Sequence, residues 1–275
     1  MSLLDYYSIV MNLVCATEVV KRMRGTSGAV HVMADNGWHY VVKPPSIGRR
    51  AMINEWLGAK LFQALGLRTA DVRPIRLPRS IMVDCWSCLD QHGAIGVASA
   101  FPVDPSRTAI YDFLPESMSN KLSNLDQMVG ALAVDLWTGK VSPRHCVFYR
   151  EASWWACFVD HKGMFGGVEW QCSGITDPRN PATRWAYDAA LTEREIAVWA
   201  HRISSIRPDS LRRLFLSVPD CWNDATTKCE LLQLCELLLS RQSQLPTTLR
   251  KLKFSVRADV RFTCDTMHVT PCLFS

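Results

Sequence analysis

The sequence lacks any long uninterrupted apolar segment. Its N-terminal stretch, residues 3–16, is only partly apolar, has no positively charged leader and contains Asp5 and Asn12. A membrane-spanning helix needs about 20 predominantly apolar residues, and a secretory signal needs a basic start before its apolar core. The sequence therefore predicts neither a membrane span nor a secretion signal, and we expect a cytoplasmic protein.

Concentrated positive charge is also absent. The formal net charge of +5 arises from 31 Lys and Arg against 26 Asp and Glu, and it is spread along the chain apart from short clusters at 212–213 and 250–253. Direct nucleic-acid binding needs a dense basic face or stripe. We therefore expect no direct contact with nucleic acid.

The cysteines show no regular pairing. Eleven are scattered along the chain, and the one pair at zinc or redox spacing, Cys85 and Cys88, has no second pair to accompany it. His92 alone cannot complete a tetrahedral zinc site, and no βαβ pattern surrounds the pair. The cysteines are therefore interpreted as reduced, mostly buried thiols.

What the chain does contain is enough apolar sequence for a large core. Of its 275 residues, 48% are hydrophobic, which is compatible with one bilobal unit or two small domains. Within this sequence, residues 144–149 and 154–159 are rich in aromatic and β-branched types and flank a short turn. They predict a β-hairpin, which would bring the residues just before it beside Asp160.

A second hairpin is predicted nearer the N-terminus. Residues 29–34 and 38–43 alternate in polarity around Asp35-Asn36-Gly37, a strong tight-turn signal. A helix is then predicted over residues 50–65, with Gly66 as its C-terminal stop. Glu55 lies on a row of small and apolar helix residues, so its carboxylate needs a partner, and Lys43 at the preceding strand end is the candidate.

Each of these charged residues alone would be interpreted as a surface charge. A strand lysine paired with a helix glutamate, followed later by a metal-holding aspartate before a glycine, is nevertheless the arrangement that holds ATP in kinase-like folds. A small loop at residues 24–28, containing Gly25, Ser27 and Gly28, precedes the first hairpin. Such a loop can place backbone N–H groups on phosphates, although most Gly/Ser loops are only turns.

Further elements are predicted that carry no candidate functional residues. The predicted segments are strands at 72–77 and 81–85, a helix N-capped by Ser123, a surface loop at 170–185, a helix opened by a capping box of Thr192 and Glu195, and helices at 210–217 and 228–242.

The order, spacing and residue types of these segments resemble the HipA-like kinase family. The resemblance rests on residues 15–45, on NEWLGAKLFQALGL, on GVASAFPV with YDFLPE, and on DLWTG through VDHKGMFGG, and it covers most of the chain. It implies an α+β, bilobal protein-kinase-like fold. The implied divisions are an N-lobe at 1–97, an inter-lobe hinge at 98–103, a helical C-lobe at 104–253 and a tail of unknown role at 254–275.

The resemblance also implies ATP and Mg²⁺ as cofactors. It places Gly25, Ser27, Gly28, Lys43, Glu55 and Phe101 at the nucleotide and Asp160 at the metal ion. The implied activity is transfer of the γ-phosphate of ATP to a serine or threonine of a protein. A protein substrate or partner is implied with it, an antitoxin-like protein among the candidates, because the family includes kinases of bacterial toxin–antitoxin systems.

The catalytic loop departs from the family pattern. The family usually has an asparagine after Trp-Thr-Gly, an aspartate two residues later, then an arginine and a glutamine or asparagine. This sequence has Lys140, Ser142, Arg144 and His145, so only Arg144 matches. The aspartate that would accept the substrate proton is replaced by Ser142, and His145 replaces a residue that would help to hold a metal ion.

Two functions therefore remain open. The first is a slow HipA-like kinase in which Ser142, Arg144 and His145 are the candidate catalytic residues, with His145 able to accept a proton. The second is a pseudokinase that binds a nucleotide or a partner without catalysis. Loss of a general base costs about 10²–10⁴-fold in rate, but phosphoryl transfer depends mainly on positioning and charge, so slow transfer is compatible with the loss.

Overall fold

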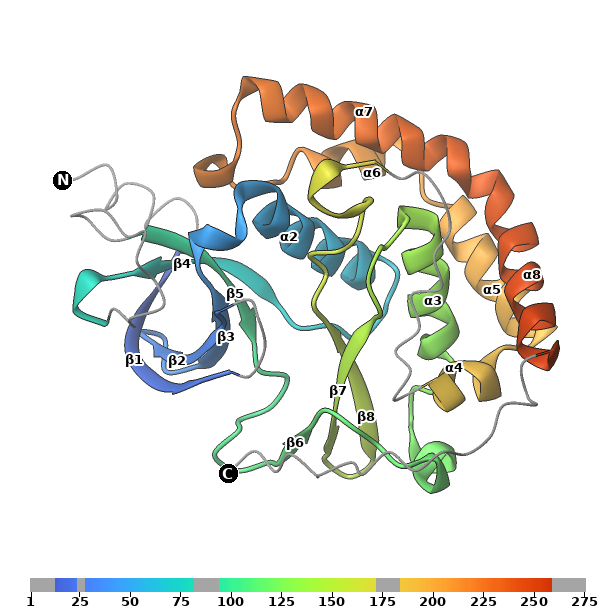
Figure 1. Cartoon of the computed structure of the whole chain (residues 1–275), viewed down its shortest axis with the longest axis horizontal. Helices are drawn as coiled ribbons and strands as arrows, with labels where there is room; N and C mark the ends of the chain where they lie inside the picture. The colour runs from blue at the N-terminus through green and yellow to red at the C-terminus, as the bar shows by residue number, and fades with distance from the viewer. Residues whose placement is uncertain (1–12, 24–27, 82–93, 172–183, 259–275) are drawn as a thin grey trace.

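A β-barrel and a group of helices lie on either side of one long helix and a β-hairpin (Figure 1). The computed structural model describes residues 13–23, 28–81, 94–171 and 184–258. In Figure 1 the barrel is on the left, helices α3 to α8 extend to the top and right, and α2 and the β7–β8 hairpin run between them. The N-terminal part is therefore rich in strands and the C-terminal part is mainly helical.

Five strands of the described chain close the barrel in the order β1-β2-β3-β5-β4. They are β1 (Val14–Arg22), β2 (Val30–Ala34), β3 (His39–Lys43), β4 (Val72–Leu77) and β5 (Ala94–Ala100). The β1–β4 pair is parallel and the other pairs are antiparallel. Alternate side chains such as Val30, Val32 and Val42 pack together in a cluster of buried barrel residues, as the twofold repeat of a strand requires.

The predicted hairpin at residues 29–43 is confirmed as β2 and β3. Gly37 has a φ of +73°, which a glycine adopts without steric cost, and its N–H donates to the carbonyl of Ala34 at 2.9 Å. Pro44 and Pro45 then end the strand, since proline has no N–H to donate. This turn fixes the register that places Lys43 at the end of β3.

The predicted helix at 50–65 is also confirmed, as α2 (Arg49–Ala64). It ends before Gly66, whose φ of +74° is the left-handed conformation usual after a helix. Ten of its residues are buried, on more than one face, because α2 packs against the barrel strands β4 and β5 as well as against α6. A polar residue within α2 is therefore removed from water and must find partners in the protein.

A smaller sheet carries the predicted hairpin at residues 144–159. It consists of β6 (Ile110–Tyr111), β7 (His145–Arg150) and β8 (Trp154–Val159), all antiparallel. Cys146, Phe148 and Phe158 on one face join the main hydrophobic cluster, whereas Val147 and Val159 on the other face pack against a separate cluster. The hairpin prediction is confirmed, with the first strand beginning one residue later.

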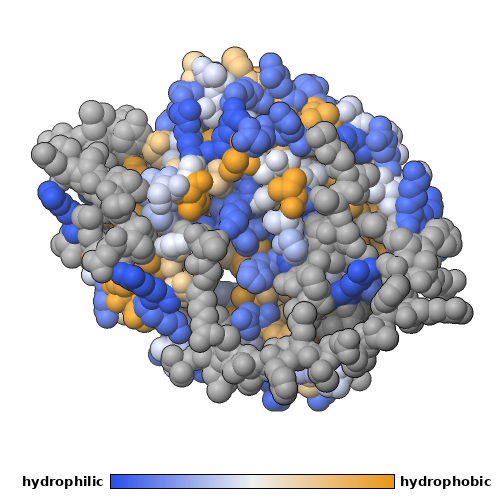
Figure 2. Space-filling view, in the orientation of Figure 1, coloured by the Kyte–Doolittle hydropathy of each residue, from blue (hydrophilic) through white to orange (hydrophobic). Residues whose placement is uncertain are grey.

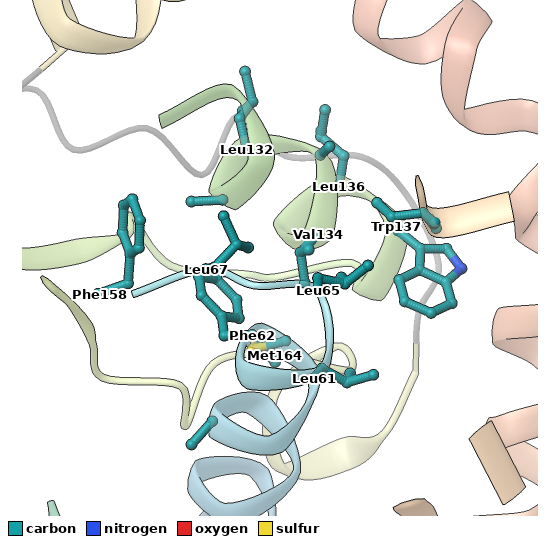
Figure 3. Packing of buried hydrophobic residues seen from close by; sticks show 14 of the residues in the cluster. Leu61, Phe62, Leu65, Leu67, Leu132, Val134, Leu136, Trp137, Phe158 and Met164 are labelled. Carbon is teal, nitrogen blue, oxygen red and sulfur yellow. The ribbon is translucent and has the colours of Figure 1, made fainter. Parts of the chain in front are cut away.

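Helices build most of the remaining structure. They are α3 (Gln127–Thr138), α4 (Arg184–Ala190), α5 (Glu193–Ser204), α6 (Pro208–Phe215), α7 (Ala225–Arg241) and α8 (Leu245–Ala258). Short 3₁₀ turns occur at η1 (Pro45–Ile47), η2 (Arg79–Ile81), η3 (Glu116–Lys121), η4 (Gly167–Glu169), η6 (Asp220–Trp222) and η7 (Gln242–Gln244). Figure 3 shows part of the main buried cluster, which includes Leu132 and Leu136 of α3, Phe62 of α2, Phe158 and Met164.

Helix boundaries agree with the sequence in one place and differ in another. The Thr192 hydroxyl accepts a hydrogen bond from the N–H of Glu195 at 3.1 Å, so the predicted N-cap of α5 is confirmed. The predicted N-cap Ser123 is wrong, because α3 begins at Gln127 after Asp126. Residues 123–126 form turns instead, since the buried Asn124 side chain bonds to both backbone groups of Ala156 in β8.

Several predicted segments differ from the structure, and some elements of the structure were not predicted. The predicted strand at 81–85 begins in the 3₁₀ turn η2, and its other residues lie outside the described chain. Residues 98–100 of the predicted hinge complete β5, because they bond to β3 and β4. The predicted loop at 170–185 ends in α4, and residues 254–258 of the predicted tail belong to α8. The sequence analysis did not predict β1, β6 or α8.

Surface polarity is mixed on the face seen in Figure 2. Hydrophobic residues lie there in several separate patches among hydrophilic ones. Among the described residues, no helix combines the length and apolar character needed to cross a membrane.

Candidate functional site

Three charged side chains from three different elements meet between the barrel and the hairpin. Lys43 ends β3, Glu55 lies in the middle of α2, and Asp160 follows β8. The ammonium Nζ of Lys43 contacts Oε1 of Glu55 and lies 2.7 Å from Oδ1 of Asp160. The predicted pairing of Lys43 with Glu55 is confirmed, and one ammonium group serves both carboxylates.

The charges of this cluster stabilise one another. Burial alone would lower the pKa of Lys43, but the carboxylates of Glu55 and Asp160 outweigh it and raise that pKa above its ordinary value. Burial would likewise raise the pKa of Asp160, but Lys43 outweighs it and holds the pKa of that carboxyl well below its usual range. Lys43 and Asp160 are therefore both charged at neutral pH.

Asp160 is held by its backbone as well as by its side chain. Its φ of +60° is unusual for a residue other than glycine, and it turns the chain sharply out of β8. The next N–H, that of His161, donates to Oε2 of Glu55 at 2.9 Å. Glu55 thus binds Lys43 with one oxygen and the residue after Asp160 with the other, which links β3, α2 and the end of β8.

Arg144 supports Asp160 from the opposite side. Its guanidinium is completely buried and forms a two-point ion pair with Asp135 of α3, including an Nε–Oδ2 bond of 2.9 Å. Its Nη1 donates to the carbonyl oxygens of Val159 at 3.0 Å and Asp160 at 3.3 Å. In this arrangement Arg144, predicted as catalytic, acts on the site through the backbone of Asp160.

His161 is neutral and has a defined tautomer. Its Nδ1 lies 3.0 Å from Nη1 of Arg144, which can only donate, so Nδ1 accepts and the proton is on Nε2, 3.0 Å from the Thr69 hydroxyl. Complete burial and the charges of Arg144 and Lys140 lower the pKa of His161 well below its ordinary value. Protonation would place a second positive charge against the guanidinium.

The residues that replace the family's catalytic loop lie beside this cluster. Nζ of the buried Lys140 donates to Oγ of Ser142 at 2.8 Å and to the carbonyl of Asp160 at 3.2 Å. Burial and the charge of Arg144 lower the pKa of Lys140 to about 8. His145 is exposed at the start of β7, opposite Val159. The structure therefore brings Ser142 close to Asp160 and leaves His145 at the surface.

The remaining predicted nucleotide residues are only partly described. Gly25 and Ser27 lie outside the described residues, and Gly28 precedes β2 with a φ of +62°. Phe101 follows β5, and both of its backbone groups are bonded: its N–H to the carbonyl of His39 at 3.0 Å and its carbonyl to the indole of Trp38 at 3.2 Å. Its ring packs against His31.

The described residues offer limited ligands for a metal ion. They contain no cluster of three or more His, Cys, Asp or Glu side chains that could hold one. Mg²⁺ in nucleotide sites is nevertheless commonly bound by one or two carboxylates together with phosphates and water. The partly exposed carboxylate of Asp160 fits that role for one ion, whereas Ser142 and His145 supply no carboxylate for a second.

Two structural residues of this site were not identified from the sequence. For Asp135 the sequence analysis predicts no partner, although a carboxylate inside an otherwise apolar helix is a signal of a buried partner. It predicts no role for Asn54, although this residue is as deeply buried within α2 as Glu55 is. Asn54 binds groups more than 100 residues away, whereas Asp135 binds Arg144, which lies nine residues further along the chain.

Comparison with known families confirms the predicted resemblance. The model of a family described as HipA-like kinase matches residues 16–133. This stretch includes Lys43, Glu55 and the first part of α3, and it ends before Asp135 and Asp160. No curated protein matches the sequence significantly.

Solved structures show what the fold is. The crystal structure of the Golgi casein kinase aligns with a TM-score of 0.51 and 12% identity over 91% of this chain and 73% of that chain. The same kinase with Mn and ADP bound gives 0.50 and 12% over 90% and 74%. The Helicobacter pylori proinflammatory kinase CtkA gives 0.49 and 12% over 86% and 97%. The two Golgi casein kinase alignments show a protein-kinase-like fold with a β-rich N-terminal region.

We expect the buried Arg144–Asp135 pair to be essential for stability. Arg144→Met leaves the carboxylate of Asp135 buried without its partner, which costs about 3–5 kcal/mol in the free energy of unfolding. Urea denaturation measures this change. Arg212→Met, which breaks an exposed ion pair with Glu236, is the control and should leave the midpoint nearly unchanged. Equal effects of the two substitutions would contradict the structural role of Arg144.

The neutral state of His161 makes stability depend on pH. Its pKa is lowered in the folded chain, so between pH about 6.5 and 5 the unfolded chain binds the extra proton and stability falls as the pH falls. His161→Phe should be less stable at pH 8 but should lose less stability on going from pH 7 to 5. His31, whose pKa is also lowered by burial, is present in both proteins, so their difference reports His161. Parallel pH profiles would refute this expectation.

Proposed function

We propose that this chain, which matches the HipA-like kinase family over residues 16–133 and has a kinase-like fold, is a slow ATP-dependent phosphotransferase. It would transfer the γ-phosphate of ATP to a serine or threonine hydroxyl of a protein. The observation that carries the proposal is the contact of Lys43 with both Glu55 and Asp160. Kinases need the lysine–glutamate pair and the aspartate together.

Each residue of the cluster has a role in the proposal. Lys43 would bind the α- and β-phosphates, and Glu55 orients it. Asp160 would hold Mg²⁺, which when bound neutralises charge on the β- and γ-phosphates. The loop with Gly25, Ser27 and Gly28 would cover the phosphates with its N–H groups. A nucleotide and a divalent ion are bound in the Golgi casein kinase structure with Mn and ADP, which has the same fold.

The apolar face of the hairpin offers a surface for the adenine base. Val147 and Val159 are partly buried, and they pack in one cluster with Val103 and Phe101 from the connection after β5. An adenine ring needs such an apolar surface beside backbone polar groups. Because both backbone groups of Phe101 are already bonded, to His39 of β3 and to the indole of Trp38 just before it, we place its contribution in its side chain and assign the polar contacts to its neighbours.

The proposal includes a bilobal arrangement. We assign residues 1–97 to an N-lobe that contains α2 and the barrel apart from the last three residues of β5, residues 98–103 to the hinge, and residues 104–253 to the C-lobe, with residues 254–275 as a further segment. The nucleotide would bind between the lobes, where β3 and α2 meet the end of β8.

The catalytic loop explains why transfer would be slow. Relative to the family pattern, Lys140 in place of asparagine and Ser142 in place of aspartate both make the loop more positive. Added positive charge favours binding of the anionic nucleotide. Replacement of the aspartate by Ser142 also removes the group that would accept the substrate proton. Phosphoryl transfer by this chain would then depend on positioning and charge alone.

A pseudokinase is the second candidate function. The observation that favours it is Ser142, which takes the position of the catalytic aspartate and whose Oγ already accepts a bond from Lys140. Such a protein would bind ATP and a protein partner without transfer. In either case the resemblance supports a protein substrate or partner, an antitoxin-like protein among the candidates.

The first experiment measures nucleotide binding and phosphate transfer in parallel. We expect the chain to bind a fluorescent ATP analogue with Mg²⁺ and to transfer label from γ-labelled ATP to itself or to proteins of a cell extract. Asp160→Asn keeps the shape of the side chain but loses its charge, so Mg²⁺-dependent binding should weaken by about 10- to 100-fold and transfer should vanish. Asp209→Asn, a change on the exposed surface of α6, is the control.

Restoring the family's aspartate distinguishes the two functions. Ser142→Asp supplies a proton acceptor beside Lys140, so the rate of transfer should rise by about 100-fold or more, while the added negative charge should weaken nucleotide binding. Ser142→Asn, which has the shape but accepts no proton, is the matched control. Nucleotide binding without transfer in the native chain would establish the pseudokinase, and absence of nucleotide binding would refute both functions.

A further inference from the structure

We propose that Asn54 is a positioning residue that holds the segment after Asp160 in place through its side-chain amide. This segment, residues 161–170, is called the Asp160 loop below. Of the two measurements that test this inference, nucleotide affinity rests on the proposed nucleotide site, whereas amide hydrogen exchange does not.

The amide of Asn54 is bonded on both ends to the Asp160 loop. Its Nδ2 lies 2.8 Å from the carbonyl oxygen of Lys162 and 3.1 Å from those of Met164 and Gly167. Its Oδ1 accepts a bond from the indole N–H of Trp170 at 2.8 Å. The side chain is completely buried, so its amide group has no water as a substitute partner.

The neighbouring residues of α2 contact the same loop. Glu55 accepts the N–H of His161, and Gly58 lies so close that a methyl group there would be 2.7 Å from Sδ of Met164. Figure 3 shows Met164 beside Phe62, one turn further along α2. Glycine at 58 and the amide at 54 therefore allow the loop backbone to lie directly on the helix that carries Glu55.

Arg50 extends this contact by one more turn. Its Nη1 donates to the carbonyl of Val168 at 3.1 Å, and its guanidinium lies over the ring of Trp170 at 4.8 Å. Arg50 is only partly buried, so these bonds contribute less than those of Asn54. The contacts of Arg50, Asn54 and Glu55 show that one face of α2 binds the loop along its length.

The consequence concerns how the site is assembled. In many kinases a phosphorylated side chain orders the segment after the metal-holding aspartate by pairing with arginines. Here a buried amide of α2 makes the equivalent contacts with residues 162–170. Helix α2 then positions both carboxylates that bind Lys43: it carries Glu55 itself, and through Asn54 it holds the loop that follows Asp160. In this inference the Asp160 loop adopts its conformation without phosphorylation.

The test compares two buried asparagines in the full chain. Asn54→Ala removes the bonds to the Asp160 loop, whereas Asn124→Ala removes a similar set of buried bonds to Ala156 in β8. Both should lower the melting temperature. Only Asn54→Ala should accelerate amide hydrogen exchange in residues 161–170 by about tenfold or more relative to the core of α3, because the loop opens more readily once its carbonyl groups lose the bonds to Asn54.

The second readout is the nucleotide affinity with and without Mg²⁺. If Asn54 positions Asp160, Asn54→Ala should reduce the gain in affinity for a fluorescent ATP analogue that Mg²⁺ provides, by about tenfold, and leave the affinity without Mg²⁺ nearly unchanged. Trp170→Phe keeps an aromatic ring but removes the N–H donor to Oδ1. It should shift both readouts in the same direction by a smaller factor, and it serves where Asn54→Ala does not fold.

The outcomes separate this inference from the proposed function. Faster exchange confined to residues 161–170 supports the role of Asn54 even if the chain binds no nucleotide. Absence of nucleotide binding would refute only the proposed function. Uniformly faster exchange in both alanine variants, or a loss of affinity that is the same with and without Mg²⁺, would overturn the positioning role.

Discussion

The ion pairs of Lys43 with Glu55 and Asp160 are the contacts on which the rest of the site depends. An ammonium group at the end of a barrel strand is removed from water, and its burial is tolerated because carboxylates from two other elements surround it. Since the same ammonium binds both, β3, α2 and the end of β8 have to adopt one relative position. The bonds from Glu55 to His161 and from Asn54 to the following loop extend that constraint along α2.

A second buried ion pair fixes the site from the helical side. Asp135 of α3 and Arg144, just before β7, are both completely buried, and Nη1 of the guanidinium also binds the carbonyls of Val159, the last residue of β8, and of Asp160. Asp160 is therefore held by its carboxylate from one side and by its backbone from the other. The neutral ring of His161 lies between the two ion pairs, bonded to Arg144, and a charged ring there would disrupt both.

The sequence predicts those parts of the site that follow local signals. The Asn-Gly turn identifies the strand that ends in Lys43, the helical period identifies the buried row with Glu55, and the aromatic hairpin places Asp160. The role of Arg144 could not be predicted in the same way, because arginine is usually exposed and its partner lies nine residues earlier in another element. β5 was partly interpreted as a connection because AIGVASA consists mostly of small residues, whose strand character comes from pairing with β3 and β4.

The distribution of burial bears on how the two candidate functions should be separated. Lys43 and Arg144 are the cations of these pairs, so removing either one would leave a carboxylate without its partner, whereas Glu55 and Asp160 share Lys43 and the loss of one leaves the other paired. The ion pairs therefore contribute to the fold whether or not phosphate is transferred. Ser142 is only partly buried, and its Oγ accepts a bond from the buried ammonium of Lys140. The ion pairs described above do not include Ser142. Because those ion pairs would be needed in a kinase and in a pseudokinase alike, a measurement of phosphate transfer, rather than the presence of the ion pairs, distinguishes the two candidate functions.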